Sequence, residues 1–180
     1  DMLEFSRGIP LMPTPKGENV VIITGAGGSG VLLSDACVEN KLNLMQIPPD
    51  LDAAFRKFIP PFGAAGNPID ITGGEPPITY VNTVRLGLSD PRIHALILGY
   101  WHTIVTPPMV FAKNMVEIKN EMKAKGIEKP IVASLAGDIE VEEAAEYLYQ
   151  NGIPAYAYST EIPVAVLGAK YKWARGAGLL

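Results

Sequence analysis

Long apolar runs alternate with amphipathic stretches along most of the chain. The run from Val20 to Thr24 is continuous and rich in β-branched residues, which is typical of a strand covered on both faces of a parallel sheet. Similar runs predict strands at 42–47, 93–101, 130–135 and 155–157, and a small strand with glycine turns within 66–74. The pattern therefore predicts a sheet of largely buried strands.

The stretches between these strands carry apolar residues at helical spacing. They predict helices at 29–40, 50–58, 76–88, 107–125, 138–150 and 161–175. We expect Asp50 and Asp138 to cap helix N-termini, and Gly126 and Gly152 to follow helix ends. Strands that alternate with helices of about ten residues or more predict an α/β fold, a doubly wound parallel sheet with helices on both faces.

Residues 1–15 differ from the rest of the chain, because a short predicted helix is followed by Pro10, Pro13 and Pro15. This pattern suits a linker helix and connector that arrive from a preceding domain. We expect the domain itself to span residues 16–180, and the chain, which begins without methionine, to be part of a longer protein.

Composition narrows the possible partners. With 180 residues, 48% of them hydrophobic, the chain is long enough for one substantial core. A charged fraction of 19% and a net charge of −4 show no basic excess, so we predict neither nucleic acid nor a membrane as partner. The single Cys37 fits a reducing compartment, and we expect a cytoplasmic protein without metal ligands. The sequence has neither an apolar run of about 20 residues nor the pattern of a signal peptide.

The loop after the first strand carries the strongest chemical signal. In open parallel sheets, ligands bind beyond the carboxyl ends of the strands, and glycines there let backbone N–H groups approach an anion at a helix N-terminus. Other loops at this edge are 72–74, 99–106 and 136–138. The residues that we predict to bind phosphate are Thr24, Gly25, Ala26, Gly27, Gly28, Ser29 and Gly30.

Three interpretations compete for this loop. The glycines at 25, 27 and 30 match the G-x-G-x-x-G dinucleotide pattern, but Gln46 and Ile47 stand where a ribose-binding acid is needed. A P-loop is excluded, because Val31 and Leu32 replace its Lys and Ser/Thr. A simple tight turn needs fewer small residues. Phosphate binding without a dinucleotide is the interpretation we favour.

In this order and spacing, the motifs resemble one known family, the NDP-forming (ADP-forming) acyl-CoA synthetases, which are relatives of succinyl-CoA synthetase. The resemblance is to their second flavodoxin-like domain, the ligase-CoA domain, and it covers nearly the whole chain from Val20. It implies a flavodoxin-like three-layer α/β/α fold. Even residues 1–5 are similar to the helix that joins the flavodoxin-like domains in fused members. The segments that carry the resemblance are 20–30 with Asp35, 66–73, Leu88-Ser89-Asp90-Pro91 and 95–98.

The resemblance implies a stepwise ligase. An acyl-CoA and phosphate give an acyl phosphate, whose phosphoryl group passes to a histidine and then to a nucleoside diphosphate. The phosphohistidine would lie between two helix N-termini, one of them at Gly27 to Gly30 here. The histidine loop, the CoA-binding domain and the ATP-grasp domain are absent from the sequence, so they are expected as partners on the same or a separate chain. The whole enzyme would use CoA, ATP/ADP and Mg, while this domain would bind no cofactor firmly and be inactive alone.

Further residues near the predicted site carry open alternatives. Asp70 is either an acceptor that orients the glycine loop or a turn former, and Thr72, Gly73 and Gly74 are expected to support the same site. His102 has no obvious carboxylate partner, so a structural role is favoured over a catalytic one. The loop 99–103 lacks the small residues that the family resemblance implies.

Some polar and aromatic residues are interpreted as structural. His94 is expected at the opposite edge of the sheet, and Asp35 either faces solvent or caps a neighbouring loop. Trp101 and Trp173 are expected in the core or at an interface. The acidic helix face that needs only solvent is formed by Glu140, Glu142, Glu143 and Glu146. Two other functions remain open: a stand-alone regulator that senses phosphate, a nucleotide or an acyl-CoA, and a dinucleotide-dependent oxidoreductase, which the missing acid disfavours.

Overall fold

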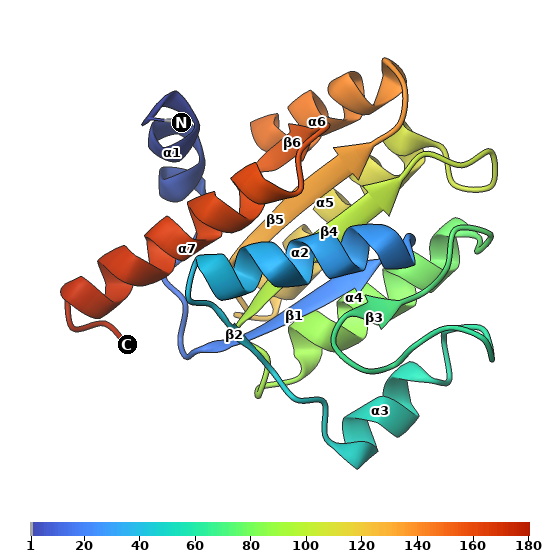
Figure 1. The fold of residues 1–180 in the computed structure, drawn as a ribbon, viewed down its shortest axis with the longest axis horizontal. Helices are drawn as coiled ribbons and strands as arrows, with labels where there is room; N and C mark the ends of the chain where they lie inside the picture. Colours follow the sequence, from blue (N-terminus) through green and yellow to red (C-terminus); the bar gives the residue numbers. More distant parts are fainter. Residues whose placement is uncertain (1) are drawn as a thin grey trace.

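The computed structural model describes residues 2–180 and shows a layered α/β arrangement (Figure 1). The strands are β1 (Asn19–Thr24), β2 (Asn43–Leu44), β3 (Ile69–Asp70), β4 (Ala95–Trp101), β5 (Ile131–Ala136) and β6 (Ala155–Ala157). The helices are α1 (Met2–Gly8), the 3-10 helix η1 (Ile9–Leu11), α2 (Gly27–Glu39), α3 (Pro49–Phe55), α4 (Pro77–Ser89), α5 (Pro108–Ala124), α6 (Glu140–Gln150) and α7 (Glu161–Gly176). None of these helices is long and apolar enough to cross a membrane.

The strands form one parallel sheet in the order β2-β1-β4-β5-β6. The short strand β3 also pairs in parallel with β1. It pairs with Ile23 and Thr24 on the same edge where β2 pairs with Asn19 and Val20. Because β1 lies inside the sheet, the chain first forms β2 on one side of β1 and later forms β4 on the other side of β1. This order confirms the predicted doubly wound α/β fold.

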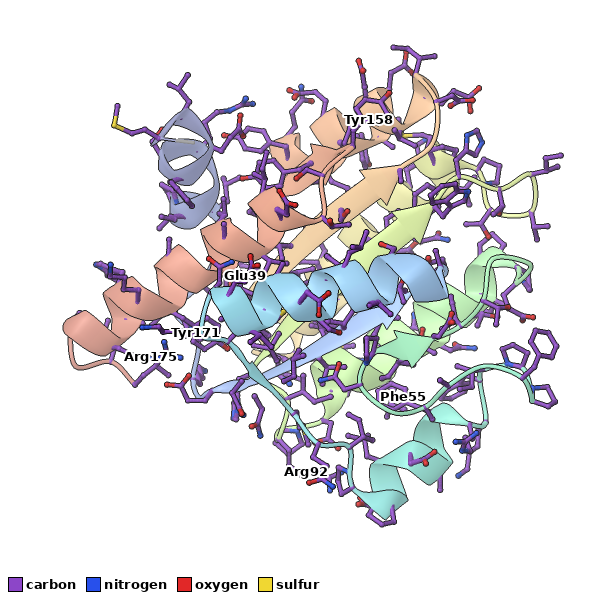
Figure 2. The ribbon with its side chains drawn as sticks, viewed as in Figure 1. Glu39, Phe55, Arg92, Tyr158, Tyr171 and Arg175 are labelled. Atoms are coloured by element: carbon purple, nitrogen blue, oxygen red, sulfur yellow. The ribbon has the colours of Figure 1, made fainter. Side chains whose placement is uncertain are left out.

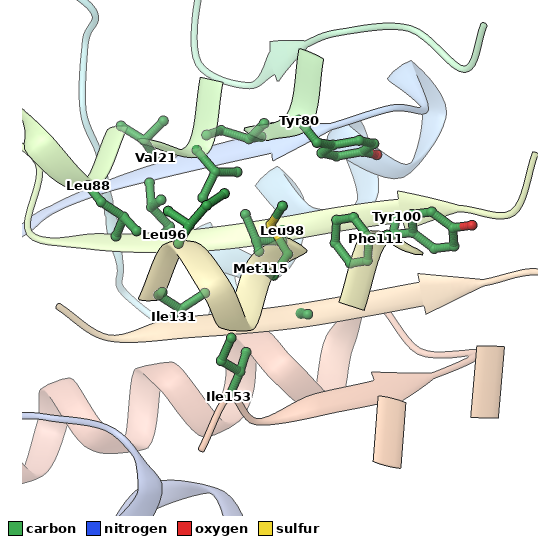
Figure 3. Packing of buried hydrophobic residues seen from close by; sticks show 14 of the residues in the cluster. Val21, Tyr80, Leu88, Leu96, Leu98, Tyr100, Phe111, Met115, Ile131 and Ile153 are labelled. Atoms are coloured by element: carbon green, nitrogen blue, oxygen red, sulfur yellow. The ribbon is translucent and has the colours of Figure 1, made fainter. Parts of the chain in front are cut away.

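Helices cover both faces of the sheet (Figure 1). Helices α2 and α7 lie over one face, where Ile22, Leu33 and Tyr171 belong to a buried cluster. Helices α3 to α6 cover the other face, whose larger cluster is shown in part in Figure 3. In that cluster the rings of Tyr100 and Phe111 stack with centroids 4.5 Å apart, and Tyr80 meets Phe111 edge-on at 5.0 Å. These aromatic side chains fill the core beneath the carboxyl edge of the sheet.

The predicted elements are all present, but some of their ends differ. Helix α2 begins at Gly27 rather than at Ser29, so the last glycines of the loop are already helical. The strand predicted at 42–47 is reduced to β2, because the residues after Leu44 leave β1.

The two predicted N-caps also need correction. Pro48 occupies the cap position of α3, and the Asp50 carboxylate instead pairs with Arg92 at 2.9 Å. Ile139 precedes α6 in the cap position, although Asp138 Oδ1 still accepts the N–H of Glu140 at 3.1 Å. Both residues therefore lie near a helix start, at positions shifted from the prediction.

The short helix predicted near the start of the chain is observed as α1 within the described residues, whereas Asp1 lies outside them, and its role as a linker stays a prediction. It packs against α7, and an added Cβ on Gly8 would lie 2.7 Å from a methyl group of Val166. The Oη of Tyr156 donates a 3.3 Å hydrogen bond to the backbone oxygen of Glu4. The segment thus adheres to the sheet domain, while the boundary at residues 15 and 16 stays a prediction.

One side chain completes the hydrogen bonding of β1. Between the residues of β1 that pair with β2 and those that pair with β3, the Asn67 amide takes the place of a strand. Its Oδ1 accepts the N–H of Ile22 at 2.9 Å, and its Nδ2 donates to the backbone oxygens of Val20 at 2.8 Å and Met45 at 3.1 Å. Buried backbone groups need such partners, and the Asn67 hydrogen bonds therefore anchor the long connection 45–68 to the sheet.

We predict that Asn67→Ala lowers the free energy of unfolding by about 1–3 kcal/mol, because it leaves the buried N–H of Ile22 in β1 without an acceptor. The matched control is Asn43→Ala, which removes an exposed amide contact of 2.9 Å with Asn19 and is expected to cost less than about 0.5 kcal/mol. Urea unfolding of the two variants checks the difference. Equal midpoints for both variants would show that Asn67 is dispensable to the sheet.

Candidate functional site

The glycine loop lies where the strand order reverses. It leaves the carboxyl end of β1 at Thr24, between β4 and β3, and runs directly into α2. In doubly wound sheets this switch point is where ligands bind, because the loops on its two sides diverge and open a crevice.

Hydrogen bonds hold the first part of the loop. Gly25 donates its N–H to the backbone oxygen of Gly99 at 3.1 Å, and Ala26 donates to Thr24 Oγ1 at 3.0 Å. Further on, Gly30 donates to the backbone oxygen of Ala26 at 3.0 Å, as the first bond of α2. Among the predicted phosphate-binding residues, the N–H groups of Gly25, Ala26 and Gly30 therefore already have acceptors within the protein.

The backbone N–H groups of Gly27, Gly28 and Ser29 remain free. Among residues 2–180, no backbone or side-chain acceptor receives them, and no side chain caps α2. Gly27 and Gly28 are exposed and Ser29 is partly so. The first turn of α2 also holds no acidic residue, so its partial positive charge of about half an elementary charge is open to an external anion.

The loop glycines differ in how much space a Cβ atom would have at each position. A Cβ built on Gly25 would lie 2.4 Å from Tyr80 Oη, and that hydroxyl is fixed because it donates to the backbone oxygen of Gly99 at 2.9 Å. On Gly27, a Cβ would lie 2.8 Å from Asp70 Oδ2. On Gly28, it would meet nothing within 4 Å. Close packing thus requires glycine at 25 and 27, whereas the space beside Gly28 is open.

The loop 70–74 packs beside the glycine loop. Asp70 Oδ1 accepts the N–H of Thr72 at 2.8 Å, while its Oδ2 faces Gly27, so the carboxylate both forms the turn and borders the glycine loop. Thr72 has a φ of 63°, and a Cβ on Gly73 would lie 3.3 Å from the backbone oxygen of Gly25. Gly74 has open space around it. The structure therefore brings the two predicted loops together.

A hollow of about 820 Å³ lies in front of the free N–H groups. Its opposite wall consists of Trp101 at the end of β4 and of the loop after β6. Tyr158, labelled in Figure 2, has a φ of 62° and donates its hydroxyl to the backbone oxygen of Asp138 at 3.0 Å. The lining residues are Gly25, Ala26, Gly28, Ser29, Leu32, Trp101, Ser134, Ala136, Tyr158, Ser159 and Thr160.

Sequence reasoning missed the wall formed by β5 and the loop after β6. Ser134 Oγ donates to the backbone oxygen of Ser159 at 2.7 Å, which ties that loop to the sheet. The available signal was topological: the loop at 158–160 follows a parallel strand, so it must end at the same edge as the glycine loop. Trp101 is 54% exposed and lines this hollow, so it is a surface residue of the site rather than part of the core.

His102 has carboxylate partners, contrary to expectation. Its Nδ1 lies 3.1 Å from Asp138 Oδ1 and its Nε2 lies 3.7 Å from Glu140 Oε2. These side chains offer atoms within 4.8 Å of one another that are of the kind that bind metal ions. Ordinary pairing of an imidazole with two exposed carboxylates accounts for this grouping, and His102 is not among the residues that line the hollow.

The other residues that the sequence singled out lie away from the hollow. His94 is at the opposite edge, as predicted, where its Nδ1 accepts the N–H of Asn19 at 3.1 Å. Asp35 and the acidic face of α6 are exposed. Trp173 is 49% exposed beneath the Lys170 ammonium. Burial raises the pKa of the Cys37 thiol to about 12, so this thiol is unreactive.

Comparison with known proteins gives a consistent result. The family model described as "Ligase-CoA domain" matches residues 20–180. The chain is 37% identical over 175 residues to acetate–CoA ligase (ADP-forming) I subunit alpha of Pyrococcus furiosus, covering 97% of this chain and 37% of that relative. It is 33% identical over 173 residues to acetate–CoA ligase (ADP-forming) of Methanocaldococcus jannaschii, covering 96% of this chain and 24% of the relative.

Solved structures agree in fold. Dinucleotide-forming acetyl-coenzyme A synthetase 1 of Ca. Korarchaeum cryptofilum, in its apo form, superposes with a TM-score of 0.89 at 33% identity. The match covers 97% of this chain and 37% of that chain. The complex of the same protein with phosphate and ADP gives a TM-score of 0.88, with the same identity and coverage. The present chain therefore spans little more than a third of these relatives, and a smaller share of some others.

We predict that Gly25→Ala destabilises the domain by about 1–3 kcal/mol, because the new methyl group overlaps a hydroxyl that the core holds in place. Gly28→Ala, the matched control, adds the same methyl group in open space at the start of a helix. It is expected to be neutral or to stabilise by up to about 1 kcal/mol. Thermal melts of the two variants measure the contrast, and similar melting temperatures would contradict the packing described for Gly25.

Proposed function

The chain belongs to the ligase-CoA domain family of ADP-forming acyl-CoA synthetases, and from that premise we propose that it holds the transferring phosphoryl group at the N-terminus of α2. The phosphoryl group would be carried on a histidine of another domain. That histidine would enter the hollow beside Gly28 and present its phosphoryl oxygens to the free N–H groups of residues 27–29.

One observation carries the proposal: consecutive N–H donors, uncapped and exposed, open onto a hollow at the switch point. A phosphoryl group carries nearly two negative charges and several acceptor oxygens. Fixed N–H dipoles stabilise such charge without reorganising during the transfer, which is the electrostatic part of phosphoryl-transfer catalysis. The supporting residues are the ones that keep the loop in shape, namely Asp70, Thr72, Gly73 and Gly74.

The complete reaction needs further parts. Phosphate would attack the carbonyl carbon of an acyl-CoA, the C–S bond would break, and CoA would leave with formation of an acyl phosphate. The phosphoryl group would then pass to histidine, releasing the acid, and from histidine to ADP. We propose that a CoA-binding domain with the histidine and an ATP-grasp domain with Mg complete the enzyme. The structure of the Korarchaeum synthetase in complex with phosphate and ADP supports these ligands.

The length of the relatives favours this hypothesis over a stand-alone regulator. The similar ligase subunits and structures extend well beyond the region matched here. No acid stands after β2 for a dinucleotide ribose, since Gln46 and Ile47 follow it. The oxidoreductase alternative therefore finds no support.

We predict that the isolated 180-residue chain neither forms nor cleaves an acyl-CoA with nucleotide, because the proposed histidine and nucleotide site lie elsewhere. A coupled assay for ADP-dependent acyl-CoA cleavage, run against a mock preparation, checks this. Turnover by the pure chain would overturn its assignment to a partial site.

The direct test of the phosphoryl site is Gly28→Asp in the intact enzyme. The added carboxylate has room and would occupy the place of the anion, so phosphoenzyme formation should fall at least about a hundredfold, of the order seen when an oxyanion donor is lost. The fold should persist, because a carboxylate near a helix N-terminus contributes about 0.3–1 kcal/mol of stability.

The matched control is Gly176→Asp, at the far end of α7, where an added Cβ also meets nothing within 4 Å. It should label normally. Phosphoenzyme is measured from labelled ATP, alongside a thermal melt of each variant. Normal labelling of folded Gly28→Asp would refute the proposal.

A further inference from the structure

Lys129 occupies an unusual position at the amino edge of the sheet, just before β5. It lies between two hollows, of about 220 and 380 Å³, and belongs to the lining of both. The apolar side chains of Leu88 and Ile127 line both hollows as well. This edge is opposite to the glycine loop, because the strands are parallel and the loop follows the carboxyl end of β1.

The ammonium group of Lys129 has no carboxylate partner among residues 2–180. Its Nζ donates to the backbone oxygen of Asp90 at 2.6 Å. The Asp90 carboxylate is already paired with Arg92, whose Nη2 lies 2.6 Å from Oδ2 and whose Nε lies 2.9 Å from Oδ1. Arg92, labelled in Figure 2, also pairs with Asp50. The neighbouring Glu128 carboxylate lies 3.7 Å from Lys123 Nζ.

The surroundings of Lys129 disfavour its positive charge. Burial in the wall between the hollows lowers the pKa of Lys129 to about 8, against the weaker opposing effect of Asp90. The charged and titratable groups that face the two hollows are Lys16 and His94 in one, Lys119 and Lys123 in the other, and the Glu128 carboxylate in both. Burial and the nearby Lys129 lower the pKa of His94, and burial and Lys123 lower the pKa of Lys119. About a tenth of the Lys129 amine is therefore neutral at pH 7.

We propose that Lys129 is a site of covalent acylation by activated acyl groups, that is, by acyl phosphates or acyl-CoA thioesters. The lone pair of the neutral Nζ attacks the carbonyl carbon of the donor. The C–O bond to phosphate, or the C–S bond to CoA, breaks, and phosphate or thiolate leaves with the bonding electrons. The nitrogen loses a proton to water, and a neutral amide remains.

The site suits these donors. Both are anionic, and the lysines around the hollows raise the local concentration of anions. Acylation also removes a positive charge that the surroundings disfavour. The proposal rests on the proposed function in one respect, namely that acyl phosphates and acyl-CoA are produced beside this domain. The reactivity of the Lys129 amine is independent of that function, because it depends only on this chain.

The experiment exposes the isolated chain to acetyl phosphate in one arm and to acetyl-CoA in the other, and quantifies acetylation of each lysine by peptide mass spectrometry. The internal controls are the exposed Lys57, Lys113 and Lys172. At pH 7, an amine with a pKa of about 8 has roughly 200 times more neutral form than an ordinary lysine side chain, whose pKa is about 10.4, and its lower basicity makes each neutral amine somewhat less nucleophilic. We expect Lys129 to react about tenfold faster than the controls with at least one donor.

The pH profile supplies a second readout. The acetylation rate at Lys129 should level off above about pH 8, whereas the rate at an ordinary lysine amine, with a pKa of about 10.4, keeps rising toward pH 10. The Lys129→Arg variant should leave the control rates unchanged and so exclude transfer from Lys129 to its neighbours. Lys129 reacting no faster than the controls with both donors, or rising in parallel with them up to pH 10, would overturn the proposal.

Discussion

The hydrogen bonding of β1 along both edges is the constraint on which the rest of the structure depends. Residues 20–24 are fully buried, so none of their backbone groups can turn to water. One edge is paired with β4, while the other is divided among β2, the Asn67 amide and β3. This division brings the connection 45–70 back along β1. It sets Asp70 beside Gly27 and so fixes the shape of the crevice at the switch point.

The start of α2 lacks the side-chain cap that stabilises most helices. Helices usually begin with a Ser, Thr, Asp or Asn side chain that satisfies a free N–H and contributes about 1 kcal/mol. Here Ala26 stands in the cap position, and the first N–H groups have no partner among the described residues. An anion in the hollow would supply what the cap omits. The same absence of side chains at Gly25 and Gly27 lets Tyr80 and Asp70 pack closely, so the glycines serve packing and access together.

The succession of strands and helices along the chain and the position of the glycine loop were predictable, because they follow from local patterns: β-branched runs, and glycines after a strand. What the sequence could not give is long-range. The carboxylate partner of His102, Asp138, lies in the loop after β5, and Tyr158 reaches the hollow from the loop after β6. Neither contact is visible in a local sequence motif. Asp50 was a poor cap prediction because Arg92, distant in sequence, pairs with its carboxylate. Asn67 carries no signal that it would replace a strand.

The central claim is that the free N–H groups of residues 27–29 form an anion site. A crystal of the chain, or of the intact enzyme, soaked in phosphate tests it directly. The account predicts phosphate oxygens at hydrogen-bond distance, about 2.7–3.1 Å, from these backbone nitrogens, inside the hollow beside Gly28. Phosphate bound only at surface lysines, with the start of α2 left empty at saturating phosphate, would contradict it.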